Sequence, residues 1–167
     1  MGPLTIDIVI PALDEEASLP RVLADLPAGA VRRVVVADNG STDSTAAVAR
    51  EAGAFVVRET RRGYGSACLA GLRAIREAPP HPDVVVFLDA DYSDRPDELP
   101  SLVRPIADGS ADLVIGSRVL GRREPGALLP QARWGNWLAT RLIHWVTGVR
   151  FTDLGPFRAI RYRALLQ

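Results

Sequence analysis

Two aspartates separated by one alanine are the residues best placed to do chemistry in this chain. They lie in Leu88-Asp89-Ala90-Asp91, at the end of the apolar run Val84–Leu88. In an extended chain residues i and i+2 point the same way, so the two carboxylates would repel each other unless a cation lies between them. Mg²⁺ and Mn²⁺ are held by one or two carboxylates together with water and substrate phosphates. We therefore predict a metal–diphosphate site at Asp89 and Asp91, although a solvated turn with Asp94 as a helix cap would give the same pattern.

Polar residues also follow two earlier apolar runs. Asp38 opens the segment Asp38–Asp43, in which Asn39-Gly40 predicts a tight turn and Ser41 or Thr42 a helix cap. At the end of a strand, Asp38 lies where a base or ribose is held in open α/β sheets. The segment after the first run, Pro11–Glu16, lacks the glycine-rich turn of dinucleotide-binding enzymes, which argues against a Rossmann dehydrogenase. We interpret at least two of its three acids as residues favoured at a helix N-terminus.

A glycine turn, Gly63-Tyr64-Gly65-Ser66, precedes another predicted helix. Such a turn can present backbone N–H groups to an anion, and it can equally serve as an ordinary loop and cap. The turn pattern alone therefore does not distinguish an anion site from a helix cap.

The elements that must position these residues follow from the apolar pattern. Runs that are short and continuous rather than alternating are typical of buried parallel strands. We predict strands at 6–10, 34–37, 55–57, 84–88 and 113–115, and helices at 15–26, 44–53, 66–77, 97–108 and about 131–147. This alternation predicts an α/β fold with an open, mostly parallel, Rossmann-like sheet flanked by helices on both faces. Ligands of such sheets bind outside the carboxyl ends of the strands, where the polar residues lie.

Composition narrows the class of protein. The chain has 167 residues, of which 47% are apolar and 24% charged, and its single cysteine, Cys68, is expected to be a buried, inert thiol. No run reaches the ~20 apolar residues that span a bilayer, and no signal peptide is evident, so we expect a cytoplasmic protein. All 20 basic residues are arginine, which excludes Schiff-base lysine enzymes and P-loop nucleotidases.

Charge divides the chain into two parts. Residues 1–112 hold 18 acidic and 11 basic side chains, whereas residues 113–167 hold 2 and 9. The later part is therefore expected to face phosphates, an anionic surface or the acidic first part. It lacks the interleaved aromatic and basic residues of a nucleic-acid platform, so no nucleic acid is expected as a partner. The last residues stop within a predicted helix without a cap, and we expect a further C-terminal segment in the natural protein.

Taken in order, these segments resemble the family 2 inverting glycosyltransferases of the GT-A fold. The resemblance runs from residue 6 to about residue 161 and rests on Ile10–Glu16, Asp38–Asp43 and Asp89–Asp91. Four more segments resemble the branch that makes dolichyl- or polyprenyl-phosphate sugars; they are Arg62–Gly65, Gly116–Arg118, Arg133–Asn136 and Thr152–Arg158. That branch uses a nucleotide sugar as donor and a lipid phosphate, on the cytosolic face of a membrane, as acceptor.

The resemblance implies one catalytic domain over 1–167, with a nucleotide-sugar part at 1–112 and an acceptor part at 113–167. Asp89 and Asp91 would bind Mg²⁺ or Mn²⁺; because Ser93 stands where the branch often has a glutamine ligand, water or Asp94 would fill that position. The residues implied to contact the GDP- or UDP-hexose are Pro11, Leu13, Glu15, Asp38, Gly63, Asp89 and Ala90. The residues implied in catalysis are Asp91, Arg118, Arg133 and Asp153, of which the two arginines would receive the acceptor phosphate.

The mechanism depends on the acceptor. A phosphate acceptor is already an anion and needs no base, whereas a sugar hydroxyl would need one, with Asp153 as the first candidate. We expect metal-dependent, inverting transfer of a hexose to polyprenyl phosphate by a protein peripheral to the cytoplasmic membrane face. The alternatives are a hydroxyl-acceptor transferase in cell-envelope glycan synthesis and a nucleotide-sugar-binding module without catalysis. A homodimer is also considered among the partners.

Overall fold

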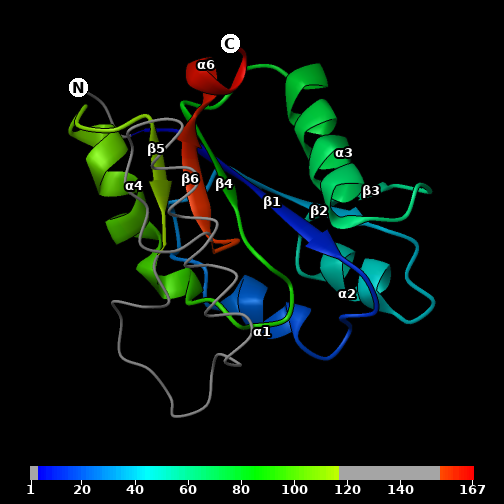
Figure 1. Ribbon diagram of the computed structural model, residues 1–167. Coiled ribbons are helices and arrows are strands. Elements are labelled where there is room, and N and C mark those ends of the chain that lie inside the picture. Colours follow the sequence, from blue (N-terminus) through cyan, green and yellow to red (C-terminus); the bar gives the residue numbers. More distant parts are fainter. Residues whose placement is uncertain (1–3, 117–154) are drawn as a thin grey trace, which may run out of the picture. The chain divides into compact units, whose positions relative to one another are not determined.

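The computed structural model describes residues 4–116 and 155–167 (Figure 1). The chain divides into two compact units, one formed by residues 1–114 with 157–167 and the other by residues 115–156. The first unit contains the sheet and most of the predicted donor site, and it is described below. Arg118, Arg133, Asp153 and the helix predicted near 131–147 lie outside the described residues.

All five predicted strands are present, and a sixth joins them. The elements in chain order are β1 (Ile6–Ala12), α1 (Leu19–Ala24), β2 (Arg33–Asp38), α2 (Thr45–Glu51), β3 (Phe55–Arg58), α3 (Tyr64–Glu77), β4 (Val84–Phe87), the 3₁₀ helix η1 (Pro96–Glu98), α4 (Leu99–Ala107), β5 (Leu113–Ile115), β6 (Arg158–Arg161) and α6 (Tyr162–Leu165). The strand order is β3-β2-β1-β4-β6-β5. The β1–β2, β1–β4 and β2–β3 pairs are parallel, whereas β4 and β6 are antiparallel.

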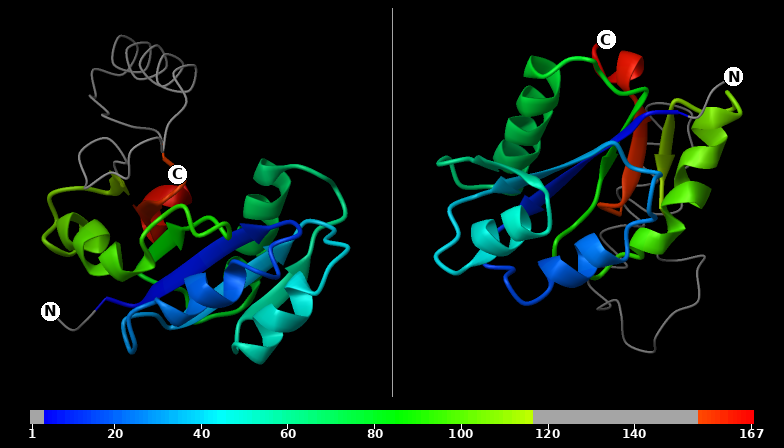
Figure 2. Two further views of the ribbon diagram at one scale, coloured as in Figure 1. Left: turned by 90° about the horizontal axis from the view of Figure 1, so that it is seen from below. Right: turned by 180° about the vertical axis from the view of Figure 1, so that it is seen from behind.

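Side chains that alternate along the strands build two apolar layers. Ile8 and Ile10 of β1 face the layer that α1, α2 and α4 cover, whereas Val9 faces the layer that α3 and α6 cover. Figure 2 shows helices on both sides of the sheet. The predicted sheet with helices on both faces is therefore confirmed, and it accounts for the continuous apolar runs, because each strand is buried on both sides.

One helix and one strand differ from the prediction. The first helix begins at Leu19 rather than near Glu15, with Pro20 in its first turn, where a missing N–H costs nothing. Strand β6 was not predicted, because its sequence Arg-Ala-Ile-Arg lacks a continuous apolar run. Among the described residues no helix is both long enough and apolar enough to span a bilayer.

Candidate active site

The strand order creates a topological switch point between β1 and β4. The chain passes from β1 to β2 and β3 on one side and then returns to β4 on the other side of β1. The β1–β2 ladder runs on to Ala12 and Asp38, whereas the β1–β4 ladder ends at Val9 and Phe87. Open α/β sheets bind ligands at the carboxyl ends of strands where the order reverses in this way. The predicted metal and nucleotide residues follow these same strand ends.

The two predicted metal carboxylates lie just beyond β4. Ala90 between them is buried, whereas Asp91 is exposed and its Oδ1 accepts a hydrogen bond of 2.9 Å from the Ser93 backbone N–H. Tyr64, at the start of α3, hydrogen-bonds to the Asp89 carboxylate, and burial together with that negative charge raises the pKa of Tyr64.

These carboxylates fit a hard divalent cation. Both supply only oxygen atoms, which Mg²⁺ and Mn²⁺ prefer. Within residues 4–116 and 155–167 there is no group of three or more His, Cys, Asp or Glu side chains that could hold a metal ion by itself. A pair of aspartates leaves coordination positions for water and for the oxygens of a substrate diphosphate, which is the arrangement predicted from the sequence.

Tyr92 anchors the loop after Asp91, a role that no sequence pattern indicated. Its backbone has φ of 61°, a left-handed conformation that is uncommon for a bulky residue. The Arg21 guanidinium lies over the Tyr92 ring, with its Cζ atom 4.2 Å from the ring centroid. The Tyr92 hydroxyl donates a hydrogen bond to the Asp25 carboxylate. The turn that carries Asp91 is therefore tied to α1 and its C-terminal cap.

The predicted nucleotide residues meet at the ends of β1 and β2. Asp38 is 5% exposed, and its Oδ1 accepts a hydrogen bond of 2.8 Å from the Ser41 N–H. Pro11 is buried in β1 and pairs with Ala37, one residue before Asp38. Leu13, just past β1, is exposed at the same end. The structure thus places Pro11, Leu13 and Asp38 together, and their contact with a nucleotide stays a prediction.

The acids after β1 have a different structural role from the one predicted. Asp14 Oδ1 accepts a 2.7 Å hydrogen bond from Thr42 N, and Glu16 Oε2 accepts one of 2.8 Å from Ser44 N. In return, the Asp14 N–H donates to Ser41 Oγ and the Glu16 N–H donates to Asp43 Oδ2. These acids therefore join two loops rather than the first turn of α1, which contains no acidic residue.

The helix cap predicted after β2 is also corrected. Helix α2 begins at Thr45 with Ser44 as its N-cap residue; the Ser44 side chain makes no cap hydrogen bond, and the Thr45 N–H donates to Asp43 Oδ1 at 2.9 Å. The Ser41 and Thr42 hydroxyls hydrogen-bond to Asp14 instead, because the loop after β1 lies against the loop after β2. Glu15 also joins this contact through its N–H, which donates to Thr45 Oγ1 at 2.7 Å, so its predicted contact with the donor is untested.

A cavity lies along α3, and neither of the predicted metal carboxylates is among its lining residues. It has a volume of about 580 Å³, and its lining includes Arg73, Arg76 and Leu72 of α3 and Tyr162 and Leu165 of α6. It contains none of the predicted donor-site residues. We therefore assign the chemistry to the strand ends rather than to this cavity.

Comparison with known proteins identifies the family. The sequence model of the protein family described as glycosyl transferase family 2 matches residues 7–167. The chain belongs to this family. The resemblance seen in its motifs is therefore confirmed at the level of the family, and its predicted use of a nucleotide sugar agrees with that membership.

Individual relatives are similar over most of this chain. An uncharacterized glycosyltransferase of Mycobacterium tuberculosis is 42% identical over 165 residues, 96% of this chain and 69% of that protein. The undecaprenyl-phosphate 4-deoxy-4-formamido-L-arabinose transferase of Pseudomonas aeruginosa is 36% identical over 182 residues. That match covers all of this chain but only 50% of the Pseudomonas protein. The solved glucosyl-3-phosphoglycerate synthase of M. tuberculosis, in complex with Mn²⁺, UDP-glucose and phosphoglyceric acid, matches with a TM-score of 0.73 and 29% identity. That match covers 97% of this chain and 58% of the solved chain, and it confirms the predicted GT-A fold.

Proposed function

We propose that this family 2 glycosyltransferase moves a hexose, with inversion, from a GDP- or UDP-sugar to a polyprenyl phosphate, using Mg²⁺ or Mn²⁺. The observation that carries the proposal is that Asp38 and the Asp89–Asp91 pair follow the carboxyl ends of β2 and β4, the two strands that flank β1 at the switch point of the sheet. The family membership supports the nucleotide-sugar donor. The lipid acceptor is supported by the Pseudomonas aeruginosa relative, whose name specifies undecaprenyl phosphate.

Each group of predicted site residues has a separate role in the proposed transfer. Asp89 and Asp91 would hold the cation, which when bound offsets the negative charge that develops on the leaving diphosphate. Asp38 offers a buried carboxylate to the hydroxyl or N–H groups of the nucleoside. We propose that Arg118 and Arg133 bind the acceptor phosphate, because a guanidinium can bind phosphate through two parallel hydrogen bonds. We also propose that the enzyme acts at the cytoplasmic face of the membrane, where such an acceptor would lie.

A second acceptor class has its own support. The glucosyl-3-phosphoglycerate synthase structure holds a small phosphorylated acid together with UDP-glucose. An acceptor of this kind is also anionic, so the basic part 113–167 fits it as well. If a hydroxyl of that acceptor is the nucleophile, a base is needed, and Asp153 is the candidate.

The donor site can be tested with one charge-removing variant and a matched control. Asp91→Asn removes a predicted metal carboxylate, whereas Asp97→Asn removes an exposed carboxylate nearby that pairs with Arg95 at 2.7 Å. UDP or GDP with Mn²⁺ at 100 times its Kd should stabilise wild type and Asp97→Asn by about 2.7 kcal/mol, and EDTA should abolish the effect. Asp91→Asn should keep its thermal stability without ligand and lose this stabilisation. Metal-dependent stabilisation of Asp91→Asn equal to that of wild type would contradict the metal assignment.

Transfer assays then decide the acceptor. Wild-type enzyme is given the nucleotide sugar with undecaprenyl phosphate in detergent, or with 3-phosphoglycerate, and the glycosylated product is detected by mass spectrometry. A product from the lipid phosphate alone supports the proposal. A product from phosphoglycerate alone supports the second acceptor class, and nucleotide binding without either product supports a non-catalytic binding module.

A further inference from the structure

We propose that Asn39 is a positioning residue, which holds the turn between β3 and α3 against the donor site. Asn39 follows Asp38 at the end of β2 and is only 5% exposed. Its Nδ2 donates to the carbonyls of Glu59 and Arg61 at 3.2 and 2.9 Å. Its Oδ1 accepts from the Gly63 N–H at 2.7 Å, and its own N–H donates to the Ala12 carbonyl at 2.9 Å. One residue therefore links the end of β1, the end of β2 and the turn 59–63.

Only an amide side chain satisfies these partners. Two backbone carbonyls require a donor and one backbone N–H requires an acceptor, and asparagine carries both at the tip of a short side chain. Aspartate has the same shape but offers only acceptors when ionised, so it would face two carbonyl oxygens with a negative charge. The Gly63 N–H, which the sequence suggested for a ligand anion, is already engaged by Asn39.

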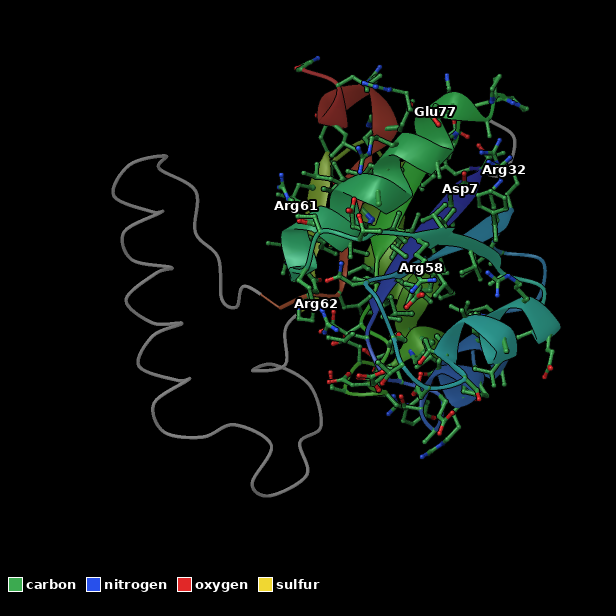
Figure 3. The ribbon with its side chains drawn as sticks, turned by 90° about the vertical axis from the view of Figure 1, so that its right-hand side faces the viewer. Asp7, Arg32, Arg58, Arg61, Arg62 and Glu77 are labelled. Atoms are coloured by element: carbon green, nitrogen blue, oxygen red, sulfur yellow. The ribbon has the colours of Figure 1, made fainter. Side chains whose placement is uncertain are left out.

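Asn39 holds the middle and the end of the turn 59–63, whereas Glu59 holds its start, because its carboxylate accepts hydrogen bonds of 2.8 Å from the Arg61 N–H and from the Arg73 guanidinium. Arg61, Arg62 and Gly63 are exposed, so no apolar burial fixes their backbone. The Arg62 side chain reaches the Gly40 carbonyl only at 3.4 Å, at the long limit of a hydrogen bond. Gly63 has φ of 129°, a conformation that side chains disfavour, at the point where the turn enters α3. Figure 3 shows Arg61 and Arg62 beside the start of α3, at the opposite end of that helix from Glu77.

The consequence for catalysis rests on the proposed function. The Glu59 N–H donates to the Asp38 carbonyl at 2.8 Å, so the turn is joined directly to a predicted nucleotide residue. Loss of the Asn39 amide should therefore loosen the side of the donor site that holds the nucleoside. The metal carboxylates follow β4 rather than β2, so the chemical step in the saturated enzyme should change little. We expect an effect on the donor KM and nucleotide Kd, and a much smaller one on kcat.

Three variants separate positioning from general destabilisation. Asn39→Ala removes all side-chain hydrogen bonds, and Asn39→Asp keeps the shape but loses the Nδ2 donors. Val103→Ala is the control, because Val103 is 5% exposed in α4 and packs in the apolar layer on the face opposite α3. It should lower stability without contacting the turn.

The first readout is limited trypsin digestion, which requires no substrate. All cationic side chains of the protein are arginine, so trypsin cuts only after arginines, and cleavage after Arg61 and Arg62 can be followed by mass spectrometry. Cleavage after Arg163, an exposed arginine of α6 that is followed by alanine, is the internal reference. Both Asn39 variants should raise the ratio of turn cleavage to Arg163 cleavage by about fivefold or more, because local opening of the turn becomes easier. Val103→Ala should leave this ratio unchanged.

The second readout is the donor kinetics. We expect each Asn39 variant to raise the donor KM and the nucleotide Kd by about tenfold while kcat stays within about threefold, the pattern of lost ground-state binding. Unchanged cleavage ratios in both variants would overturn the positioning role, and so would a KM increase of the same size in Val103→Ala. Wild-type protein that binds neither UDP nor GDP would refute the proposed donor site and this catalytic role together, while increased turn cleavage would still uphold the structural link.

Discussion

Replacing Gly71 by alanine should destabilise the protein although alanine is the better helix former. Gly71 is buried in the middle of α3, where the helix crosses β1. A Cβ atom added there would lie 2.4 Å from Cγ1 and 3.2 Å from Cγ2 of Val9. Carbon atoms in contact normally lie about 3.5–4.0 Å apart, so the new methyl overlaps Val9 severely. Val9 is fully buried and, being β-branched, cannot rotate away easily.

The magnitude follows from two opposing effects. Overpacking a core costs about 1–3 kcal/mol, and the 2.4 Å contact places this site at the upper end. Replacing glycine by alanine in a helix interior returns about 1 kcal/mol. The free energy of unfolding should therefore fall by about 2 kcal/mol, which lowers the Tm of a domain of this size by about 4–8 °C.

A double-mutant cycle and a matched glycine test the geometry. Urea unfolding is measured for wild type, Gly71→Ala, Val9→Ala and the double variant. Since Val9→Ala removes both clashing methyls, the two changes should be coupled by about 1–2 kcal/mol. Gly65→Ala is the control, because a Cβ there meets nothing within 4 Å, and it should leave stability equal or higher. If Gly71→Ala were as stable as Gly65→Ala, the close approach of α3 to β1 would be refuted.

Two further predictions concern an ion pair and hydrogen bonds near the amino-terminal ends of β1 and β4. Asp7 is fully buried and pairs with Arg32 at 2.7 Å. Asp7→Asn should therefore lower the free energy of unfolding by about 2–4 kcal/mol. This loss is smaller than for an ion pair with both partners buried, because the Arg32 side chain is 24% exposed. Calorimetry that finds an unchanged Tm would refute this. Hydrogen bonds from the Thr5 N–H and hydroxyl lower the pKa of Asp83 below 3.8, so its stabilisation is present above that pH and is lost as the pH falls through the folded-state value. The stability difference between wild type and Asp83→Asn should therefore be full at neutral pH and shrink below pH 3.8, and parallel pH profiles would refute it.

The strands and the main site motifs could be predicted because their signals are local. Val84–Phe87 is buried on both faces of the sheet, and such burial requires a continuous apolar run that is visible in the sequence. In a parallel sheet the carboxyl end of a strand is fixed by its direction, so Asp38 and Asp89 could be placed at one edge before their partners were known. Strand β6 could not be found in this way, because Arg158–Arg161 gains its place from pairing with β4 rather than from its own composition.

The roles of the acids near the strand ends could not be predicted, for a physical reason. A carboxylate that accepts hydrogen bonds from backbone N–H groups has the same sequence appearance as one that awaits a cation or a nucleotide. Asp14 and Glu16 take their N–H donors from a loop 28 residues further along the chain. Such partners are known only once β1 and β2 are paired and their loops are brought together.

The same long-range contacts explain why the site tolerates so much negative charge. The two loops after β1 and β2 pair their acids with N–H groups of each other, which offsets the repulsion that the acids would otherwise exert on a diphosphate. Asp91, by contrast, is exposed and receives one hydrogen bond from its own turn. Asn39 joins the end of β2 to the turn 59–63 without adding charge, because its neutral amide supplies both hydrogen-bond donors and an acceptor. This difference between the loops is the reason that we propose the cation site after β4, at the exposed Asp91, and the nucleoside site at the end of β2.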